Sequence, residues 1–331
     1  MNDIKVNRRT LLTASTTAGL AAAFGLPMLS KEAMAQNADK EYVFLSIVTQ
    51  VPFWVDYRNA MEDLEELMGI KTTFTGPLDF DTAAQARQLD ELIARRPAGI
   101  LIFPGDPATL APGVERAVEA GIPVTCCIGD IPDSPRSTFL GINGVQAGRV
   151  GGEMLAQAIG GKGKVILGTF PAPSTLERVD GYKQIFEEKY PEIEVVDVVN
   201  DRADPSYAPT AYLQAIQANP DIVGIGGTDG DSGKGAAIAV NEAGRTDIKI
   251  VAMDRNDDML PYIEDGTIHG AVAQKSYLEI FLAFHMMHWQ NTDGLKVLPD
   301  WKAAGINPLP ERVETGVMPI TAENVAQFKH V

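Results

Sequence analysis

Residues 100–128 have the sequence ILIFPGDPATLAPGVERAVEAGIPVTCCI, which contains one complete strand–helix–strand unit. It begins with the unbroken apolar run Ile100–Phe103 and closes with a second one, Val124–Ile128. Between them, Pro107–Ala120 has apolar residues at helical spacing and a proline at its start, and Gly121–Pro123 ends the helix. Unbroken apolar strands joined by a helix indicate a parallel sheet that is covered on both faces.

The same alternation of short apolar strands and amphipathic helices extends along the chain on both sides of this stretch. On the N-terminal side, the sequence predicts strands at Tyr42–Val48 and Lys71–Thr75 and helices at Trp54–Met68 and Thr82–Arg95. On the C-terminal side, it predicts strands at Lys164–Gly168, Val195–Val199, Ile222–Ile225, Lys249–Ala252 and His269–Ala273, and helices at Val145–Ile159, Leu176–Lys189, Tyr207–Ala218, Ser232–Ala243, Asp257–Glu264 and Tyr277–Trp289. Two such sets in 331 residues predict an α/β fold of two doubly wound parallel-sheet lobes.

The first 35 residues have the features of a twin-arginine signal peptide that is removed on export. Arg8 and Arg9 form the arginine pair, Leu20–Leu29 is the apolar stretch, and Ala33–Ala35 is a small-x-small cleavage site. A membrane anchor is the alternative, but the apolar run is too short to cross a hydrocarbon layer of ~30 Å. No cysteine follows the leader for lipid attachment, so we expect a soluble mature chain in the periplasm that begins near Gln36.

The chain carries a formal net charge of −16 and has a sequence pI near 4.7. It lacks the clustered Lys and Arg that nucleic acid or anionic lipid requires, so we expect neither as a partner. The two cysteines, Cys126 and Cys127, are adjacent in an apolar strand, where inert core thiols are expected. A redox pair or a thiolate metal site is the alternative, and no further cysteine supports it.

Motifs of enzyme chemistry are missing or incomplete. The first strand runs into Val48–Pro52 without the glycines of a dinucleotide fingerprint, and Gly224–Asp229 lacks the last glycine of that pattern. A phosphate-binding loop fails because Gly235 stands where Ser or Thr is needed. His285 and His288 share one helix face, but no carboxylate pair lies near them in sequence to complete a metal site. We therefore expect no catalysis, no cofactor and no bound metal.

Side chains suited to binding a sugar follow several of the expected strands. Sugars stack their C–H faces on aromatic rings, and their hydroxyl groups bond to carboxylates, Arg, Asn and Gln. The carboxyl ends of parallel strands are where such sheets bind ligands, so these side chains are expected to meet in a cleft between the lobes. The candidates at these positions are Phe53, Trp54, Asp130, Arg178, Asp229, Asp254 and Gln274.

Each candidate also has a purely structural alternative. Asp229 or Asp254 would serve as a helix N-cap, Trp54 would belong to the core, and Arg178 would form a surface ion pair. The recurrence of these residues at the same end of the sheets is what favours a common site.

Several short motifs along the mature chain are specific in combination: Val51–Trp54, Gly121–Val124, Gly141–Asn143, Glu177–Tyr182, Asn219–Asp221, Met253-Asp254 and Ala273-Gln274. With them, nearly the whole mature chain resembles the ribose-type (type I) periplasmic binding proteins of sugar ABC transporters. The resemblance implies a first lobe of residues 36–143 plus 275–309 and a second lobe of residues 144–274 plus 310–331. It also implies three crossovers between the lobes, near Asn143, at Gln274–Ser276 and at Pro310–Glu314.

The resemblance also implies a role for each candidate. Phe53 and Trp54 would sandwich the sugar ring, and Asn143 would lie at the hinge. Asp130 would substitute for the acidic residue that usually ends the fourth strand, where this chain has Ile128. From the second lobe, the hydroxyl groups of the ligand would be bound by Arg178, Asp229, Asp254 and Gln274.

The chain departs from the family pattern at three positions of the expected site. Ribose binders often have Asn where this chain has Val51, an acidic residue where it has Ile128, and an aromatic residue where it has Ala203. Ribose itself is therefore not the expected ligand. The candidate set has three carboxylates against one arginine, which predicts a neutral polyol, a cyclitol or an amino sugar.

The function implied by the resemblance is capture of a small sugar or polyol by a monomer that performs no chemistry. The protein would close around its ligand by hinge rotation and deliver it to an ABC permease, whose ATPase subunit hydrolyses ATP. One alternative is a periplasmic signal or chemotaxis receptor for a furanose-type autoinducer or sugar. A sugar-responsive repressor would need a DNA-binding segment where this chain has a leader, and a periplasmic enzyme would need the missing cofactor motifs.

Overall fold

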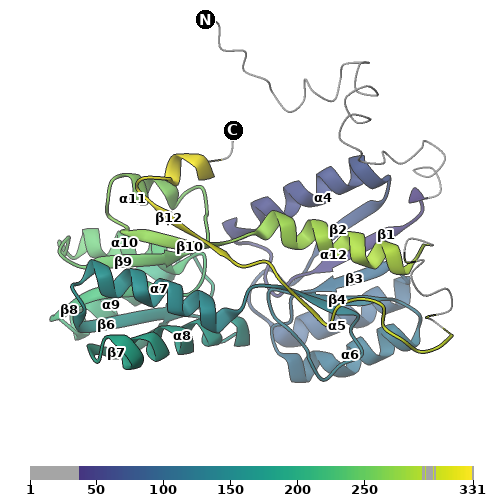
Figure 1. The fold of residues 1–331 in the computed structure, drawn as a ribbon, viewed down its shortest axis with the longest axis horizontal. Helices are drawn as coiled ribbons and strands as arrows, with labels where there is room; N and C mark the ends of the chain where they lie inside the picture. The colour runs from purple at the N-terminus through teal and green to yellow at the C-terminus, as the bar shows by residue number, and fades with distance from the viewer. Residues whose placement is uncertain (1–36, 293–294, 296–300, 302, 330–331) are drawn as a thin grey trace, which may run out of the picture.

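The computed structural model describes residues 37–292, 295, 301 and 303–329, and it shows two α/β lobes (Figure 1). The expected export leader, residues 1–35, lies outside the described residues. Each lobe contains a six-stranded sheet, and the strands of the two sheets follow the same order relative to the chain. The predicted α/β class with two sheet-based lobes is confirmed.

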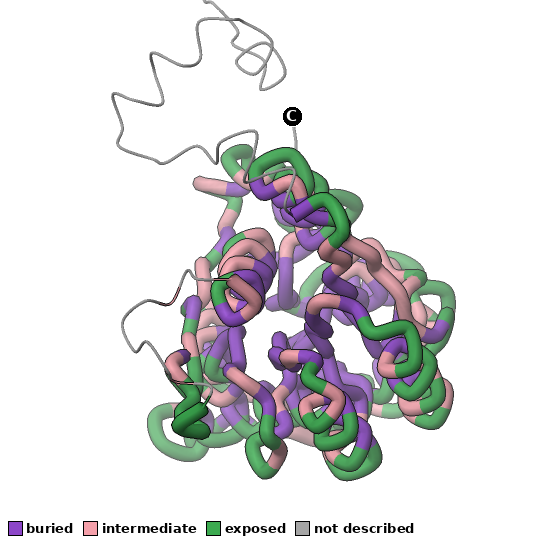
Figure 2. The backbone as a smooth tube through the Cα atoms, turned by 90° about the vertical axis from the view of Figure 1, so that its right-hand side faces the viewer, coloured by how far each residue is buried: buried purple, intermediate pink, exposed green. Residues whose placement is uncertain are grey.

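The sheet of the first lobe has the strand order β11-β5-β4-β3-β1-β2, with parallel pairing throughout its described strands. Its strands are β1 (Glu41–Leu45), β2 (Lys71–Thr75), β3 (Gly99–Ile102), β4 (Val124–Cys127), β5 (Thr138–Gly141) and β11 (Arg312–Glu314). Helices α4 (Val55–Met68) and α12 (Ser276–Gln290) cover one face, and α5 (Thr82–Arg95) and α6 (Pro107–Glu119) cover the other. All residues of β3 and β4 are buried, while exposed residues lie on the outer sides of the helices (Figure 2).

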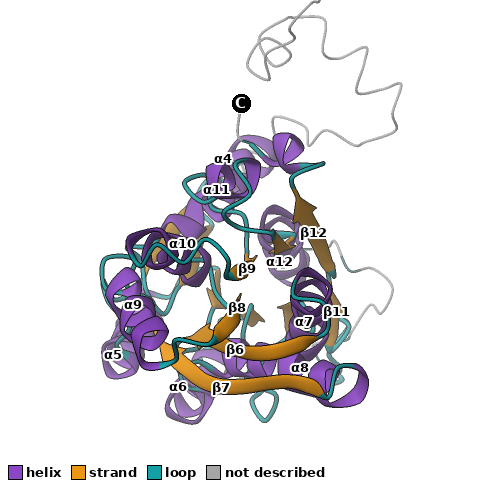
Figure 3. Cartoon of the chain, turned by 90° about the vertical axis from the view of Figure 1, so that its left-hand side faces the viewer, coloured by secondary structure: helices purple, strands orange, loops and turns teal. Residues whose placement is uncertain are grey.

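The sheet of the second lobe has the order β12-β10-β9-β8-β6-β7, and among its described strands β12 alone runs antiparallel to its neighbour. Its strands are β6 (Lys162–Thr169), β7 (Glu192–Asn200), β8 (Ile222–Gly227), β9 (Lys249–Met253), β10 (Gly270–Gln274) and β12 (Val317–Thr321). Figure 3 shows α7 (Gly144–Ala158) and α8 (Pro173–Lys189) on one side, and α9 (Ala208–Ala218) and α10 (Ser232–Glu242) on the other. Helix α11 (Leu260–Glu264) is shorter than the expected helix Asp257–Glu264, whose first residues form a turn.

Local side-chain bonds fix several helix ends in the first lobe. Asp81 accepts the backbone N–H of Ala84 over 2.8 Å at the start of α5. Asp106 does the same for Thr109 over 3.3 Å at the start of α6. Helix α4 ends at Gly69, whose φ of 67° is the left-handed conformation that glycine adopts at low cost. The two N-caps place the starts of α5 and α6 after the carboxyl ends of β2 and β3, and Gly69 ends α4 just before the amino end of β2.

Three segments connect the lobes: Ile142–Asn143 between β5 and α7, Lys275 between β10 and α12, and Thr315–Gly316 between β11 and β12 (Figure 1). The third lies just beyond the expected crossover, Pro310–Glu314. The expected boundary put Arg312–Glu314 in the second lobe, but the structure pairs this strand, β11, with β5 of the first sheet. The sequence did not predict β5, β11 and β12, each of which has only three to five residues.

A buried carboxylate joins these connections. Glu279, in the first turn of α12, has no solvent exposure and accepts hydrogen bonds from the hydroxyl groups of Tyr57 and Thr315, each over 2.9 Å. The Thr315 hydroxyl also lies 3.2 Å from the carbonyl oxygen of Gly141, where the first connection begins. Burial raises the pKa of Glu279 to about 7. One hydrogen-bonded cluster therefore links all three connections.

Candidate ligand-binding site

A cavity with about 440 Å³ of empty space lies between the lobes at the carboxyl ends of the parallel strands. The turns after β1, β3 and β4 line it from the first lobe, and the turns after β6–β10 together with α8 line it from the second. The structure brings six of the eight predicted site residues to this cavity: Phe53, Trp54, Arg178, Asp229, Asp254 and Gln274.

Arg178 reaches the cavity from the second turn of α8 and is only 2% exposed. Its Nη1 donates to the carbonyl oxygen of Thr228 over 2.7 Å. Its Nε has no hydrogen-bond partner among the described residues, although a buried guanidinium N–H is costly to leave unbonded. Arg178 is therefore not a surface ion pair, and its side chain is held in place with a donor still available to a ligand.

Asp254 follows β9 directly and has a left-handed backbone, with φ of 67°. Its Oδ1 accepts a hydrogen bond from Nε2 of Gln274, at the end of β10, over 2.7 Å. The Oε1 of Gln274 is buried and has no partner among the described residues. Asp254 does not cap a helix, because α11 begins only at Leu260. The two side chains form a polar pair that lines the cavity.

Asp229 supports a turn and also lines the cavity. Its Oδ1 accepts the backbone N–H groups of Asp231 and Ser232, each over 3.0 Å, at the start of α10. Its Oδ2 is buried, and the Asp229 carboxyl group shares a side-chain hydrogen bond with the neighbouring carboxyl group of Asp201. Asp229 thus holds the turn in front of α10 with one oxygen, while the N-cap position of that helix is occupied by Asp231.

Sequence reasoning missed two further carboxylates at this end of the second sheet. Asp231 lines the cavity directly. Asp201 follows β7 and is fully buried, and it accepts the Tyr212 hydroxyl over 3.2 Å. Burial and the neighbouring charge of Asp229 raise the pKa of Asp201 well above the ordinary range. Its place directly after a strand is the signal that would have found Asp201. Ser174 and Thr175, at the start of α8, also line the cavity and were not predicted.

Burial raises the pKa of Asp231 to about 8 and that of Asp254 to about 6. Since an unfolded carboxyl group titrates near pH ~4, the folded protein holds protons between roughly pH 4 and 8 that the unfolded chain has released. The free energy of unfolding should therefore fall as the pH rises through this window. We expect the ligand-free protein to melt at a lower temperature at about pH 8 than at about pH 5, and Asp231→Asn to reduce this difference.

Thermal melts followed by circular dichroism would check this pH dependence. Asp221→Asn is the control, because Asp221 is an exposed carboxylate of the same lobe whose pKa is lowered by its hydrogen bond to Lys164. An identical pH dependence in wild type and Asp231→Asn would contradict the assignment.

The aromatic pair of η1 (Pro52–Trp54) does not form the expected sandwich. Trp54 is 1% exposed, and its Nε1 donates to the carbonyl oxygen of Val48 over 2.8 Å, so it belongs largely to the core. The ring of Phe53 packs against it edge to face, with the centroids 4.8 Å apart. This spacing leaves no room for a sugar ring between the two, so the sandwich prediction is wrong. Both residues instead contribute to one apolar wall of the cavity.

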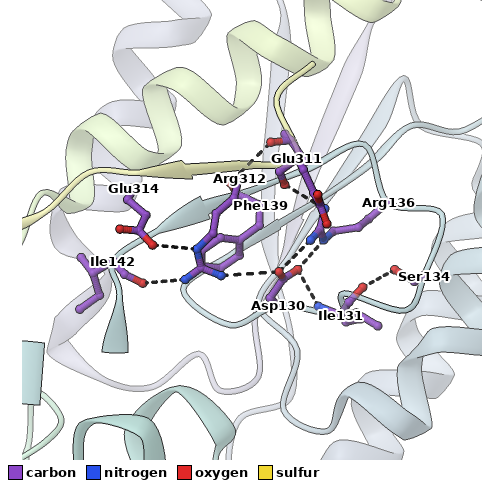
Figure 4. Close-up of polar contacts among 10 residues, drawn as sticks. Asp130, Ile131, Ser134, Arg136, Phe139, Ile142, Glu311, Arg312 and Glu314 are labelled. Carbon is purple, nitrogen blue, oxygen red and sulfur yellow. Dashed lines mark hydrogen bonds and ion pairs between the residues drawn. The ribbon is translucent and has the colours of Figure 1, made fainter. Parts of the chain in front are cut away.

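The structure places Asp130 and Asn143 outside the residues that line the cavity. The Asp130 carboxylate accepts a bond from Arg136 Nη2 over 2.8 Å and a closer one from Nε, and it also accepts the N–H of Ile131 (Figure 4). Asn143 lies at the first connection between the lobes, as expected, but its side chain caps α7 by accepting the N–H of Gln146 over 2.9 Å. Both side chains are thus occupied by structural bonds.

The described part of the chain contains no group of three His, Cys, Asp or Glu side chains able to hold a metal ion. Nor does any helix in that part have the length and apolar character needed to cross a membrane. Cys126 and Cys127 are free and fully buried, and burial raises the pKa of the Cys126 thiol to about 12. Both therefore stay as unreactive core thiols.

Two α/β lobes of matching topology, three connections and a polar cavity at the facing strand ends define a two-lobed ligand-binding protein. Residues 42–292 match the periplasmic binding protein domain family, and the chain belongs to this family. The resemblance to ribose-type periplasmic binding proteins is thereby confirmed.

Individual relatives agree with this membership. The chain is 26% identical over 271 residues to the ribose import binding protein of Bacillus subtilis, covering 81% of this chain and 87% of the relative. It is 26% identical over 265 residues to the xylitol-binding protein of Mycolicibacterium smegmatis, covering 78% and 75%. An ABC transporter solute-binding protein from Burkholderia graminis, solved in complex with D-arabinose, superposes with a TM-score of 0.80 at 26% identity, covering 89% of this chain and 99% of that one. Like these relatives, this chain is a binding protein and not an enzyme.

Proposed function

We propose that the protein captures a small polyhydroxylated ligand (a sugar, polyol, cyclitol or amino sugar) between its lobes as the substrate-binding component of an ABC importer. The observation that carries this proposal is a set of buried polar atoms without hydrogen-bond partners among the described residues. They are Ser174 Oγ, Arg178 Nε and Gln274 Oε1, and all three residues line the cavity. Buried polar atoms normally have partners, so this convergence supports a ligand whose hydroxyl groups complete the bonds.

The charges around the cavity favour a neutral or cationic ligand. Three carboxylates (Asp229, Asp231 and Asp254) line it together with a single cation, Arg178. Burial raises the pKa of all three carboxyl groups, that of Asp231 to about 8, so at neutral pH Asp231 acts mainly as a hydrogen-bonding group. Asp254, with a pKa of about 6, remains a carboxylate that repels an anionic ligand, whereas hydroxyl and ammonium groups can donate to it. Ribose, xylitol and D-arabinose, named for three relatives, are all neutral polyhydroxylated molecules.

A thermal-shift panel tests the ligand class. At about 100 times its Kd, a matching ligand should raise the melting temperature by about 5 °C, because it binds the folded state alone. We expect such a rise from members of the neutral sugars, polyols, cyclitols or amino sugars. A rise produced only by sugar acids or sugar phosphates would refute the proposal.

Contacts between the lobes support closure around the ligand by hinge rotation. Asp56 of α4 and Arg255 after β9 form a two-pronged ion pair, with both N···O distances 2.9 Å. The rings of Phe80, from the first lobe, and Phe170, which follows β6, meet edge to face with centroids 5.6 Å apart. Such contacts exist only while the lobes are together, so they bias the equilibrium toward the closed form.

Removing the ion pair should weaken binding without touching the cavity. We expect Asp56→Ala to cost about 1 kcal/mol of affinity, mainly through faster dissociation, because the partly buried pair stabilises the closed form. Calorimetry and stopped-flow kinetics would measure this. Asp221→Ala is the control, since it removes an ion pair with Lys164 that lies within the second lobe. An unchanged dissociation rate in Asp56→Ala would show that the pair plays no part in closure.

In the proposed role, the leader of residues 1–35 directs export to the periplasm. The monomer then delivers its ligand to an ABC permease, and a separate ATPase subunit drives transport. Membership of the periplasmic binding protein family and the named import binding proteins among the relatives support this role.

A further inference from the structure

The two lobes line the cavity with different chemistry. The second lobe supplies the carboxylates, Arg178 and the amide of Gln274, together with the apolar Phe170 and Ala203. Every lining side chain that the described first lobe supplies is apolar: Val48, Val51, Phe53, Trp54, Phe103 and Ile128. The indole N–H of Trp54 is no exception, because it donates to the carbonyl oxygen of Val48. A ligand hydroxyl group that points toward this wall would meet no side-chain hydrogen-bond partner.

The backbone conformation at Ile128 favours a polar side chain, although the residue there is apolar. Ile128 follows β4 and Asp254 follows β9, and these two strands have the same position in their sheets. Both residues are left-handed, with φ of 65° and 67°, and both donate their N–H to the neighbouring strand. A β-branched side chain is strained in this conformation, whereas Asp and Asn tolerate it best. The first lobe thus keeps an apolar side chain where its backbone favours a polar one.

We propose that the ligand is amphipathic: it carries its hydroxyl or amino groups on one edge and bare C–H or methyl carbon on the other. Deoxy sugars and methyl-branched polyols have this character. The polar edge lies against the second lobe and the bare edge against the wall around Ile128. This inference rests on the proposed function and narrows its ligand class, because fully hydroxylated sugars would leave a hydroxyl group buried without a partner.

Calorimetry with matched pairs of sugars tests the inference on the wild-type protein. The pairs are L-fucose with L-galactose, L-rhamnose with L-mannose, and 2-deoxy-D-ribose with D-ribose, and each differs by one hydroxyl group. We expect at least one deoxy sugar to bind about 10-fold more tightly than its parent. Tighter binding of the parent in every pair that binds would overturn the inference and leave the proposed function standing. If none of these sugars binds and no polyol, cyclitol or amino sugar of the thermal-shift panel binds either, both the inference and the proposed function are contradicted.

The variant Ile128→Asn tests the role of this apolar wall by changing the protein instead of the ligand. Asn relieves the backbone strain and places an amide against the bare edge of the ligand, so the parent sugar should gain about 10-fold and the deoxy preference should shrink. Arg96→Asn is the control, because Arg96 is an exposed residue at the end of α5 that is also left-handed, with φ of 54°. Melting temperatures would confirm that both variants are folded. An unchanged ratio of affinities in folded Ile128→Asn would overturn the inference.

Discussion

Replacing Arg178 with alanine should weaken ligand binding by about 2–5 kcal/mol, a loss of about 30-fold to several thousand-fold in affinity. The Arg178 side chain is 2% exposed, and its Nε has no partner within the described protein. The alanine variant therefore loses a buried charged donor to the ligand. Burial raises the pKa of Asp229 and Asp254, and the variant also removes the positive charge that partly offsets this rise. Isothermal titration calorimetry with the ligand identified by the thermal-shift panel would measure the loss.

A matched control separates this local loss from a general effect of removing charge. Lys183 lies on the same helix, α8, and is exposed, so Lys183→Ala removes one positive charge without reaching the cavity. Lys183→Ala should leave the ligand affinity unchanged.

The Asp254→Ala variant should lose about as much ligand affinity as Arg178→Ala, because it also leaves Nε2 of Gln274 unpaired. Near-unchanged affinity in both Arg178→Ala and Asp254→Ala would show that ligands bind elsewhere.

Gly148→Ala should lower the free energy of unfolding by about 1–3 kcal/mol, and Gly148→Val by more. An added Cβ at Gly148 would lie 2.0 Å from the carbonyl oxygen of Arg178, which is backbone and has no flexible end to move. Helices α7 and α8 would have to separate. In an exposed helix, a change from Gly to Ala would raise the free energy of unfolding by up to ~1 kcal/mol. A decrease at Gly148 would therefore identify the close packing of α7 against α8 as its cause.

The Gly148 variant also bears on the site, because the backbone that would move is that of Arg178 itself. Folded Gly148→Ala protein should bind ligand more weakly than wild type. Chemical unfolding monitored by fluorescence gives the stability, with Gln157→Ala on the exposed face of the same helix as the control. Stability at or above the wild-type value in Gly148→Ala would contradict the close contact.

Much of the fold could be predicted from the sequence because its signals are local. The strand Lys71–Thr75 and the helix Thr82–Arg95 were predicted to the residue. The helix has a capping aspartate in front of it and apolar residues at regular spacing. Strand β11 (Arg312–Glu314) has no such signal, since it has three residues and pairs with β5, far away in the sequence. Its position, and with it the third connection, depends on tertiary contacts that no local pattern records.

The site was predictable to the extent that the strand ends determine it. Ligands bind at the carboxyl ends of parallel strands, and this rule predicted which strand ends of the second lobe line the cavity. It failed for Asp130, because the nearby Arg136 pairs with this carboxylate. It failed for the aromatic sandwich because Phe53 and Trp54 follow each other in one short helix, where their rings contact each other. In both cases the side chain is occupied by a residue that lies nearby in the sequence. A position just after a strand does not reveal such a contact.

Mass spectrometry of the small molecule released from the natively purified protein would show whether the cavity between the lobes captures a polyhydroxylated ligand. The predicted result is one equivalent of a neutral or cationic polyhydroxylated molecule about the size of a single sugar ring, which disappears from the Arg178→Ala protein. Release of an anion such as a sugar phosphate, or equal recovery of the ligand from Arg178→Ala, would contradict capture by the polar face of the second lobe.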